Sequence, residues 1–233
     1  MVYSMTNISV VIPAYNESAR IADAIHSLSN QTMKPLEVIV VDNNSDDNTA
    51  DIARSLGVKV IREMKQGIIP ARDAGFNSAK GKIIARIDAD TKVASNWIEL
   101  IAHHFQREDV TALVGTVKYS DSRLTRFMNI GKAYSKLMKR VYGHHVLLGP
   151  SMALRQSTWN EIKHHTCKKD ALVHEDIDLS VHLNKHGTIL YDEKWMAETS
   201  ARRITGNPVS FFYEYPKRNY RTYVHHRKLK KLS

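Results

Sequence analysis

The chain has a single cysteine, Cys167, among its 233 residues. One cysteine excludes a framework of internal disulfide bonds and favours a protein of a reducing compartment. Long apolar runs are also absent: none approaches the roughly 18–20 residues that a membrane-spanning helix needs. The polar start MVYSMTN has no apolar core of the kind found in signal peptides. We therefore expect a cytoplasmic protein, whose membrane contact would be peripheral and at the inner face.

Acidic residues are in deficit, because 24 Asp and Glu stand against 34 Lys and Arg, a formal charge of +10. Such an excess attracts phosphates, nucleic acid or an anionic membrane surface, and the sign alone does not choose among them. The excess is concentrated in residues 216–233, which contain no acid and seven cations: Lys217, Arg218, Arg221, Arg227, Lys228, Lys230 and Lys231.

No linker or low-complexity segment divides the chain, and 42% hydrophobic with 25% charged residues is typical of a folded globular protein. Buried-strand patterns alternate with helical patterns over the first half, which predicts a mostly parallel sheet with helices on both faces. The expected fold class is thus α/β, a three-layer α/β/α sandwich. We expect strands at 8–13, 36–41, 58–61, 82–88 and 111–117, and later helices within 122–140 and 174–186.

Acidic side chains follow the predicted strands, where open parallel sheets bind their ligands. Asp88 and Asp90 form a D-x-D pair that can hold a divalent cation together with a diphosphate, and oxygen ligands favour magnesium or manganese over zinc. The alternative is that these acids solvate a turn or cap the next helix. Asp42 opens the polar loop NNSDDNT, which either binds a base or ribose or supplies helix caps through Ser45 and Asp46.

Four segments in order give the chain a resemblance to the family 2 glycosyltransferases of GT-A fold: VVIPAYNE (10–17), VVDNNSDDNT (40–49), KQGIIPARDAGFNSAKG (65–81) and IDAD (87–90). The resemblance extends through GPSMALRQSTW (149–159) and HEDIDLSVHLNKHG (174–187). It implies a glycosyltransferase domain over residues 1–205, with a nucleotide-sugar-binding half (1–117) and an acceptor-binding half (118–205). Residues 206–233 would form a basic, aromatic C-terminal extension.

The resemblance also implies roles for individual residues. Asp90, with Asp88, would bind Mn²⁺ or Mg²⁺, and Asp88 would lie near the ribose. Many family members carry a second acid directly after this D-x-D, whereas Thr91 stands here. The donor nucleotide and its diphosphate would be contacted by residues of the first four segments: Pro13, Tyr15, Glu17, Asp42, Lys65 and Arg72.

A carboxylate must remove the proton of an acceptor hydroxyl as it attacks the anomeric carbon. The segment HEDIDLSVHL is similar to the family's E-D motif, so Asp176 is the expected base, with Glu175 supporting it; the alternative is an acidic first helical turn favoured by the helix dipole. The implied reaction is an inverting transfer from a UDP- or GDP-sugar to a hydroxyl of a glycan or lipid-linked acceptor. This would serve cell-surface polysaccharide or glycolipid synthesis.

Three other functions compete with this one. A polyprenyl-phosphate sugar synthase usually carries an L-Q-H-P-type segment after D-A-D, and DADTKVASNW lacks it. A basic nucleic-acid-binding module leaves the ordered acidic motifs unexplained, so no nucleic acid is expected as a partner. A catalytically inactive sugar-nucleotide binder would not need the complete set of acids.

Histidines and the aromatic tail carry weaker signals. Eight histidines occur as adjacent pairs, whose rings point in different directions on a helix, and His182 and His186 have the i, i+4 spacing of a metal pair or of an ordinary helical surface. The tail is interpreted as an amphipathic helix that packs on the core. The alternatives are stacking on sugars, nucleic-acid binding and, foremost among these functions, contact with a membrane. The tail interleaves cations with Phe211, Phe212, Tyr213, Tyr215, Tyr220 and Tyr223.

Overall fold

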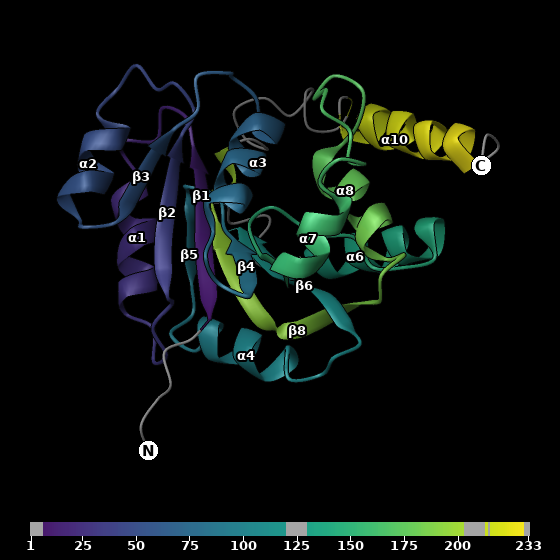
Figure 1. Ribbon diagram of the computed structural model, residues 1–233, viewed down its shortest axis with the longest axis horizontal. Coiled ribbons are helices and arrows are strands. Elements are labelled where there is room, and N and C mark those ends of the chain that lie inside the picture. The colour runs from purple at the N-terminus through teal and green to yellow at the C-terminus, as the bar shows by residue number, and fades with distance from the viewer. Residues whose placement is uncertain (1–6, 120–129, 203–212, 214, 231–233) are drawn as a thin grey trace.

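The structure is a computed structural model that describes residues 7–119, 130–202, 213 and 215–230 (Figure 1). Its first half alternates strands and helices as the apolar pattern predicts: β1 (Ile8–Ala14), α1 (Ile21–Ser29), β2 (Glu37–Asp42), α2 (Thr49–Ser55), β3 (Lys59–Arg62), α3 (Ile68–Ser78) and β4 (Ile83–Arg86). The remaining elements are β5 (Thr91–Val93), α4 (Trp97–His104), β6 (Val110–Tyr119), α6 (Ile130–Tyr142), β7 (Met152–Arg155), α7 (Gln156–Ile162), α8 (Glu175–Leu183), β8 (Thr188–Thr199) and α10 (Tyr215–Lys230).

The strands form one sheet in the order β3-β2-β1-β4-β7-β6-β8-β5. Strands β3, β2, β1 and β4 are mutually parallel, and β6 pairs in parallel with β8. Strand β7 is antiparallel to both β4 and β6, and β5 is antiparallel to β8. All strands except β5 and β7 therefore run in one direction, which confirms the expected mostly parallel sheet.

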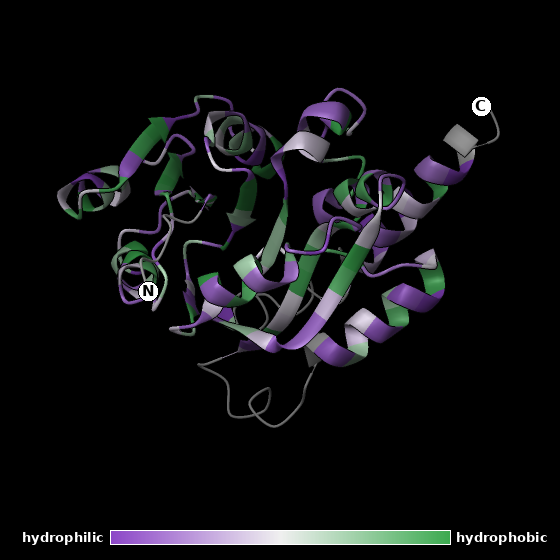
Figure 2. Cartoon of the chain, turned by 60° about the horizontal axis from the view of Figure 1, so that its bottom comes forward, coloured by the Kyte–Doolittle hydropathy of each residue, from purple (hydrophilic) through white to green (hydrophobic). Residues whose placement is uncertain are grey.

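Two hydrophobic cores lie on opposite faces of the sheet. One contains the apolar residues of α1 and α4 and a residue of α2, and in it Trp97 stacks on Trp195 with ring centroids 4.8 Å apart. The other contains residues of α3, α7 and α8, where Phe76 meets Trp159 edge to face at 5.2 Å. Figure 2 shows the hydrophobic colouring concentrated on the strands between these layers. The three-layer α/β/α arrangement is confirmed.

The C-terminal helix α10 lies beside α8 at the edge of the domain (Figure 1). Its Thr222 and His226 are buried, whereas Tyr220 is 69% exposed. The expected helical tail therefore packs on the domain through some residues and leaves others in solvent. Phe211 and Phe212 lie outside the described residues, as do positions 122–129 of the expected basic helix. The division at residue 205 stays a prediction.

The parallel strands bring their carboxyl ends to one edge of the sheet. Ala14 at the end of β1 is opposite Asp42 at the end of β2, and Val11 is opposite Arg86 at the end of β4. The loops that follow β1, β2 and β4 therefore begin side by side. These loops carry the predicted donor and metal residues, and α8 reaches the same edge through its contacts with Arg86.

Candidate functional site

Arg86 is the centre of a buried cluster of charges. Its Nη1 lies 2.5 Å from Oε1 of Glu175 and 3.4 Å from Oδ1 of Asp176, and its Nη2 lies 3.1 Å from Oδ1 of Asp88. Arg86 is only 2% exposed. The last residue of a core strand thus links the D-x-D segment to the first turn of α8, about 90 residues further along the chain.

Asp176 is held from a second direction by the loop before β7. The backbone N–H of Gly149 donates a 2.9 Å hydrogen bond to Oδ2 of Asp176. A Cβ at position 149 would lie 2.8 Å from Nη2 of Arg86 and 3.1 Å from Oδ1 of Asp88. The close approach of backbone to these charged groups explains why glycine stands here.

Glu175 and Asp176 are neighbours with opposite electrostatic behaviour. Burial would raise the pKa of Glu175, but the positive charges of Arg86 and Arg72 outweigh it and hold that pKa well below its usual range. Burial and the charge of Glu175 raise the pKa of Asp176 well above its usual range, against the opposing effect of Arg86. Glu175 therefore stays ionised, and Asp176 is the stronger base of the two.

Arg72 supports Glu175 from the side of α3. Its Nη1 lies 3.0 Å from Oε2 of Glu175, its Nη2 lies 2.7 Å from Oδ1 of Asp73, and its guanidinium sits 5.6 Å from the ring centroid of Trp159. Arg72 has no exposed surface. In this conformation it positions Glu175 and reaches no open surface, so the donor contact implied for Arg72 stays a prediction.

Asp90 lies in a second cluster at the same edge. Its Oδ1 accepts a 3.0 Å hydrogen bond from Thr199, and its Oδ2 lies 3.3 Å from Nη2 of Arg202. The same Arg202 nitrogen pairs with Oε1 of Glu17, whose Oε2 is buried without a hydrogen-bond partner. Asp90 also lines a pocket of about 190 Å³ with Arg20, Asp23, Ala24, Lys92, Glu198 and Ser200.

Thr91 cannot take over the role of the missing third acid. The residue is fully buried in β5, opposite Thr199 of β8. Its position in the sheet directs it away from solvent, so any cation ligands in this segment come from Asp88 and Asp90. Both of these residues are half-buried and keep some access to solvent.

The loops after β1 and β2 are tied to each other. The N–H of Asn16 donates to Oγ of Ser45 at 3.1 Å, and the N–H of Asp46 donates to Oδ1 of Asn16 at 2.9 Å. Ser45 and Asp46 therefore join two loops, and the alternative in which they cap α2 is wrong: α2 begins after Asn48 with no side-chain cap. The polar loop after β2 is therefore held by hydrogen bonds to the loop after β1.

The remaining predicted donor residues border these joined loops. Tyr15 is 46% exposed, whereas Pro13 and Asp42 are buried, and Oδ1 of Asp42 accepts a 3.2 Å hydrogen bond from the N–H of Ser45. Lys65 is exposed, and its carbonyl accepts a 2.8 Å hydrogen bond from Asn43. The structure thus gathers the predicted residues at one edge of the sheet.

Sequence reasoning missed Arg86 and Arg202. Arg86 had a usable signal, because a cation in the otherwise apolar run IIARI (83–87) requires buried anionic partners. Arg202 follows the long strand β8 and had no comparable signal.

Comparison with known proteins identifies the family. The sequence profile described as Glycosyl transferase family 2 matches residues 9–177. The chain belongs to this family. The acidic motifs at the sheet edge are thus those of a glycosyltransferase family, and the alternative of a basic nucleic-acid module loses its support.

Individual relatives agree with this assignment. The glycosyltransferase GlyG of Streptococcus pneumoniae is 32% identical over 114 residues, covering 46% of this chain and 38% of the relative. This chain spans less than half the length of the first curated relatives that it matches.

Solved structures share the fold at low sequence identity. The mannosyltransferase PcManGT of Pyrobaculum calidifontis, in complex with GDP-Man and Mn²⁺, superposes with a TM-score of 0.63 at 16% identity over 85% of this chain and 58% of that chain. Glucosyl-3-phosphoglycerate synthase of Mycobacterium tuberculosis, in complex with Mn²⁺, UDP-Glc and phosphoglyceric acid, gives 0.63 at 19% identity over 87% and 74% of the two chains.

Proposed function

We propose that this chain transfers a sugar from a UDP- or GDP-sugar to a hydroxyl of a glycan or lipid-linked acceptor, with inversion at the anomeric carbon. The observation that carries the proposal is the joint contact of Arg86 with Asp88 and Asp176, 3.1 and 3.4 Å away. It connects a candidate metal-binding segment to a candidate base, and a glycosyl transfer needs both on one side of the sheet.

The donor nucleotide would lie over the joined loops after β1 and β2. Tyr15 offers an exposed ring there. Oδ1 of Asp42 accepts the N–H of Ser45, and its other carboxylate oxygen, Oδ2, would bind the nucleobase. Lys65 is an exposed cation beside the same loop. The bound GDP-Man and UDP-Glc of the two similar structures support this class of donor.

The carboxylates of Asp88 and Asp90 suit a hard divalent cation. Carboxylate oxygens are the ligands that Mg²⁺ and Mn²⁺ prefer. Oε2 of Glu17 adds a third carboxylate oxygen at this edge; it is buried without a hydrogen bond and lies 3.9 Å from Nη1 of Arg20. Asp90, with Asp88, would hold the cation, which supplies charge neutralisation for the departing nucleoside diphosphate. Arg202 presently balances Asp90 and Glu17, so we expect it to move toward the diphosphate when donor binds.

Asp176 is suited to the role of base. Its raised pKa makes it a better proton acceptor than an ordinary aspartate. Arg86 and Arg72 keep Glu175 ionised, and the negative charge of Glu175 helps to keep the pKa of Asp176 high. The acceptor oxygen forms a bond to the anomeric carbon as the bond from that carbon to the phosphate oxygen breaks. The hydroxyl proton passes to Asp176, and the nucleoside diphosphate leaves with the bonding electrons.

The acceptor is expected to be a glycan or a lipid-linked sugar of a cell-surface polysaccharide or glycolipid. Among the described residues, none of the helices is sufficiently long and apolar to cross a membrane. Helix α10 carries Lys217, Arg218, Arg221 and Arg227, and basic residues near anionic lipid contribute about 1 kcal/mol each. Sedimentation with anionic liposomes at low and high salt tests this contact; no sedimentation at low salt would remove it.

A panel of nucleotide sugars with Mn²⁺ tests the transferase proposal. We expect one donor to be hydrolysed slowly without acceptor and to raise the melting temperature, and both effects to disappear with a chelator. Asp90→Asn should abolish the metal-dependent effects, whereas Asp51→Asn, an exposed change on α2, should leave them intact. If no UDP- or GDP-sugar binds in the presence of Mn²⁺ or of Mg²⁺, the proposal is wrong.

A further inference from the structure

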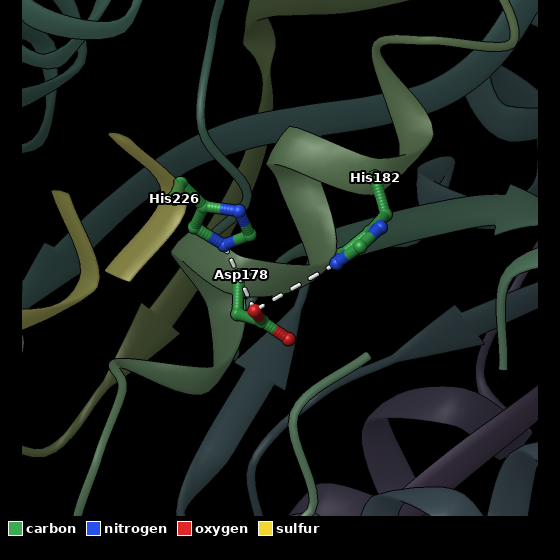
Figure 3. Close-up of side chains that lie close together, drawn as sticks. All are labelled: Asp178, His182 and His226. Carbon is green, nitrogen blue, oxygen red and sulfur yellow. Dashed lines mark hydrogen bonds and ion pairs between the residues drawn. The ribbon is translucent and has the colours of Figure 1, made fainter. Parts of the chain in front are cut away.

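We propose that Asp178, His182 and His226 form a second metal site, for Zn²⁺, that joins α8 to α10. The three side chains converge from two helices at the C-terminal side of the domain (Figure 3). They are separate from the Asp88 and Asp90 acids and make no part of the transfer reaction, so the site stands whether or not the proposed transfer is correct.

The ligand atoms are spaced for a single ion. Oδ1 of Asp178 lies 2.9 Å from Nε2 of His226 and 3.9 Å from Nε2 of His182, and one atom from each residue lies within 4.8 Å of the others. Zinc bonds to nitrogen and oxygen of about 2.0–2.2 Å place tetrahedral ligands roughly 3.4 Å apart. The three atoms therefore need shifts of only about 1 Å to bind one ion.

Burial makes an unbalanced charge here costly. Asp178 is 1% exposed, and His182 and His226 are each 8% exposed. An imidazole that faces this carboxylate offers a nitrogen ligand in its neutral form. The ion-pair partners that the described chain gives Asp178 are these two histidines. A divalent cation would balance the buried carboxylate more completely than a neutral imidazole does.

The surroundings also orient the carboxylate. Oδ2 of Asp178 accepts a 2.9 Å hydrogen bond from the backbone N–H of Cys167. The other oxygen, Oδ1, faces the two imidazoles. Such an outer hydrogen bond fixes the direction of a metal-binding carboxylate. Two imidazoles and one carboxylate suit zinc better than magnesium or calcium, because nitrogen ligands favour the borderline transition ions.

The site would fix α10 against the helix that carries the candidate base. His226 belongs to α10, and Asp178 lies two residues after Asp176 on α8. A second link between the helices lies one α10 turn earlier, where Oγ1 of Thr222 accepts a 2.7 Å hydrogen bond from the N–H of His174, the residue before α8. Zinc would therefore couple the order of the C-terminal helix to the start of α8.

The chain's other histidine patterns give useful comparisons. The i, i+4 spacing of His182 and His186, which fits a metal pair or an ordinary helical surface, gives no metal pair here: α8 ends at Leu183, and Nδ1 of His186 lies 3.0 Å from Oε2 of Glu161. His225 is adjacent to His226 with ring centroids 5.5 Å apart, and it does not belong to the cluster. His225→Gln is thus a matched control for His226→Gln, since both change the same helix by the same substitution.

Zinc titration of the chelator-treated full chain tests the site. We expect one Zn²⁺ per chain by calorimetry and elemental analysis, with a rise in melting temperature. Loss of an outer partner of a metal site costs 10–100-fold in affinity, so loss of a direct ligand should weaken binding at least about tenfold. We expect that loss in His226→Gln and Asp178→Asn, and unchanged binding in His225→Gln and Asp90→Asn.

Two measurements keep the test decisive if a variant folds poorly. Circular dichroism checks the fold of each variant, and Co²⁺ bound to the wild-type chain should give the visible absorption of a four-coordinate site of nitrogen and oxygen ligands. The proposal is overturned if the wild-type chain binds no Zn²⁺, or if folded His226→Gln binds it as tightly as the wild type. The cluster is then a hydrogen-bonded helix contact only.

Discussion

Arg86 and Glu175 form a buried ion pair, with Nη1 of the arginine 2.5 Å from Oε1 of the glutamate, across 89 residues of sequence. The pair connects the end of β4 to the first turn of α8. Because Arg72 holds the other oxygen of Glu175, the glutamate is fixed between two cations. Asp176 thus follows a residue that cannot easily move or change its charge.

Replacing Arg86 should destabilise the fold strongly. Arg86→Met leaves Glu175 buried with Arg72 as its remaining arginine, and breaking a buried pair in this way costs about 3–5 kcal/mol of unfolding free energy. Urea denaturation followed by circular dichroism measures the loss. The double variant Arg86→Met with Glu175→Leu should recover part of it, because the uncompensated charge is then gone.

The exposed pair of Arg107 with Asp109 supplies the control. Arg107→Met should leave the denaturation midpoint nearly unchanged, since solvent screens that pair. Equal losses in Arg86→Met and Arg107→Met would contradict the role assigned to the buried cluster.

Gly149→Ala should lower activity more than stability. The added Cβ would lie 2.8 Å from Nη2 of Arg86 and 3.1 Å from Oδ1 of Asp88, so both side chains must shift. Displacement of about 1 Å near reacting groups can cost on the order of 100-fold in rate, and we expect a loss of kcat/KM of at least about tenfold.

Gly57→Ala is the matched comparison for that change. Gly57 has a φ of +75° and open space where a Cβ would stand. Alanine there should cost about 1–2 kcal/mol through backbone strain, with kcat/KM retained. Loss of stability without loss of activity in Gly149→Ala would show that Gly149 serves only the fold.

Folding should be weakened by acid through His174. Burial lowers the pKa of His174 to about 4, below the value near 6.5 of the unfolded chain, so the unfolded state binds a proton first as the pH falls. The stability it contributes is complete above pH 6.5 and is lost as the pH falls toward 4, by on the order of 3 kcal/mol at 1.36 kcal/mol per pKa unit.

Denaturation at pH 7, 5.5 and 4 tests this dependence. His174→Asn should flatten the profile across that range, whereas His103→Asn, at an exposed position of α4, should leave the slope unchanged. An unaltered slope in His174→Asn would assign the acid sensitivity to other groups.

The sequence predicts the strands that carry a run of β-branched residues and misses the strands that are short or of mixed composition. The β-branched runs at β1, β2 and β4 identify themselves within a few residues, because a central parallel strand is apolar throughout. Strand β8, TILYDEKWMAET, mixes exposed and buried positions and was missed, as were β5, β7 and α7. Their positions depend on pairing with distant strands, which local pattern does not contain.

The candidate site shows the same division. Asp88, Asp90 and Asp176 stand in recognisable motifs, so their meeting at one edge could be predicted. The roles of Arg86 and Arg202 depend on partners 89 and 112 residues away. The burial of Arg72 likewise depends on how α3 packs against α7, where Trp159 covers its guanidinium.

Asp176→Asn should separate binding from chemistry. The amide has nearly the shape of the carboxylate and keeps an oxygen for the N–H of Gly149, but it cannot accept the hydroxyl proton, so turnover should fall at least about 100-fold while donor affinity holds. Turnover assays with calorimetric donor titrations measure the two effects, and Glu193→Gln, an exposed change on β8, is the control.

The pH dependence of kcat/KM distinguishes a base from a residue that only supports the structure, because a structural role for Asp176 would not change it. Because its pKa is raised, the fraction of ionised base falls as the pH drops through that value, and kcat/KM should decline on an acid limb that begins above the ordinary aspartate pKa of about 3.9. Asp176→Asn should remove this limb from the residual activity. Near-normal turnover in the variant, or an unchanged limb, would assign proton removal to another group.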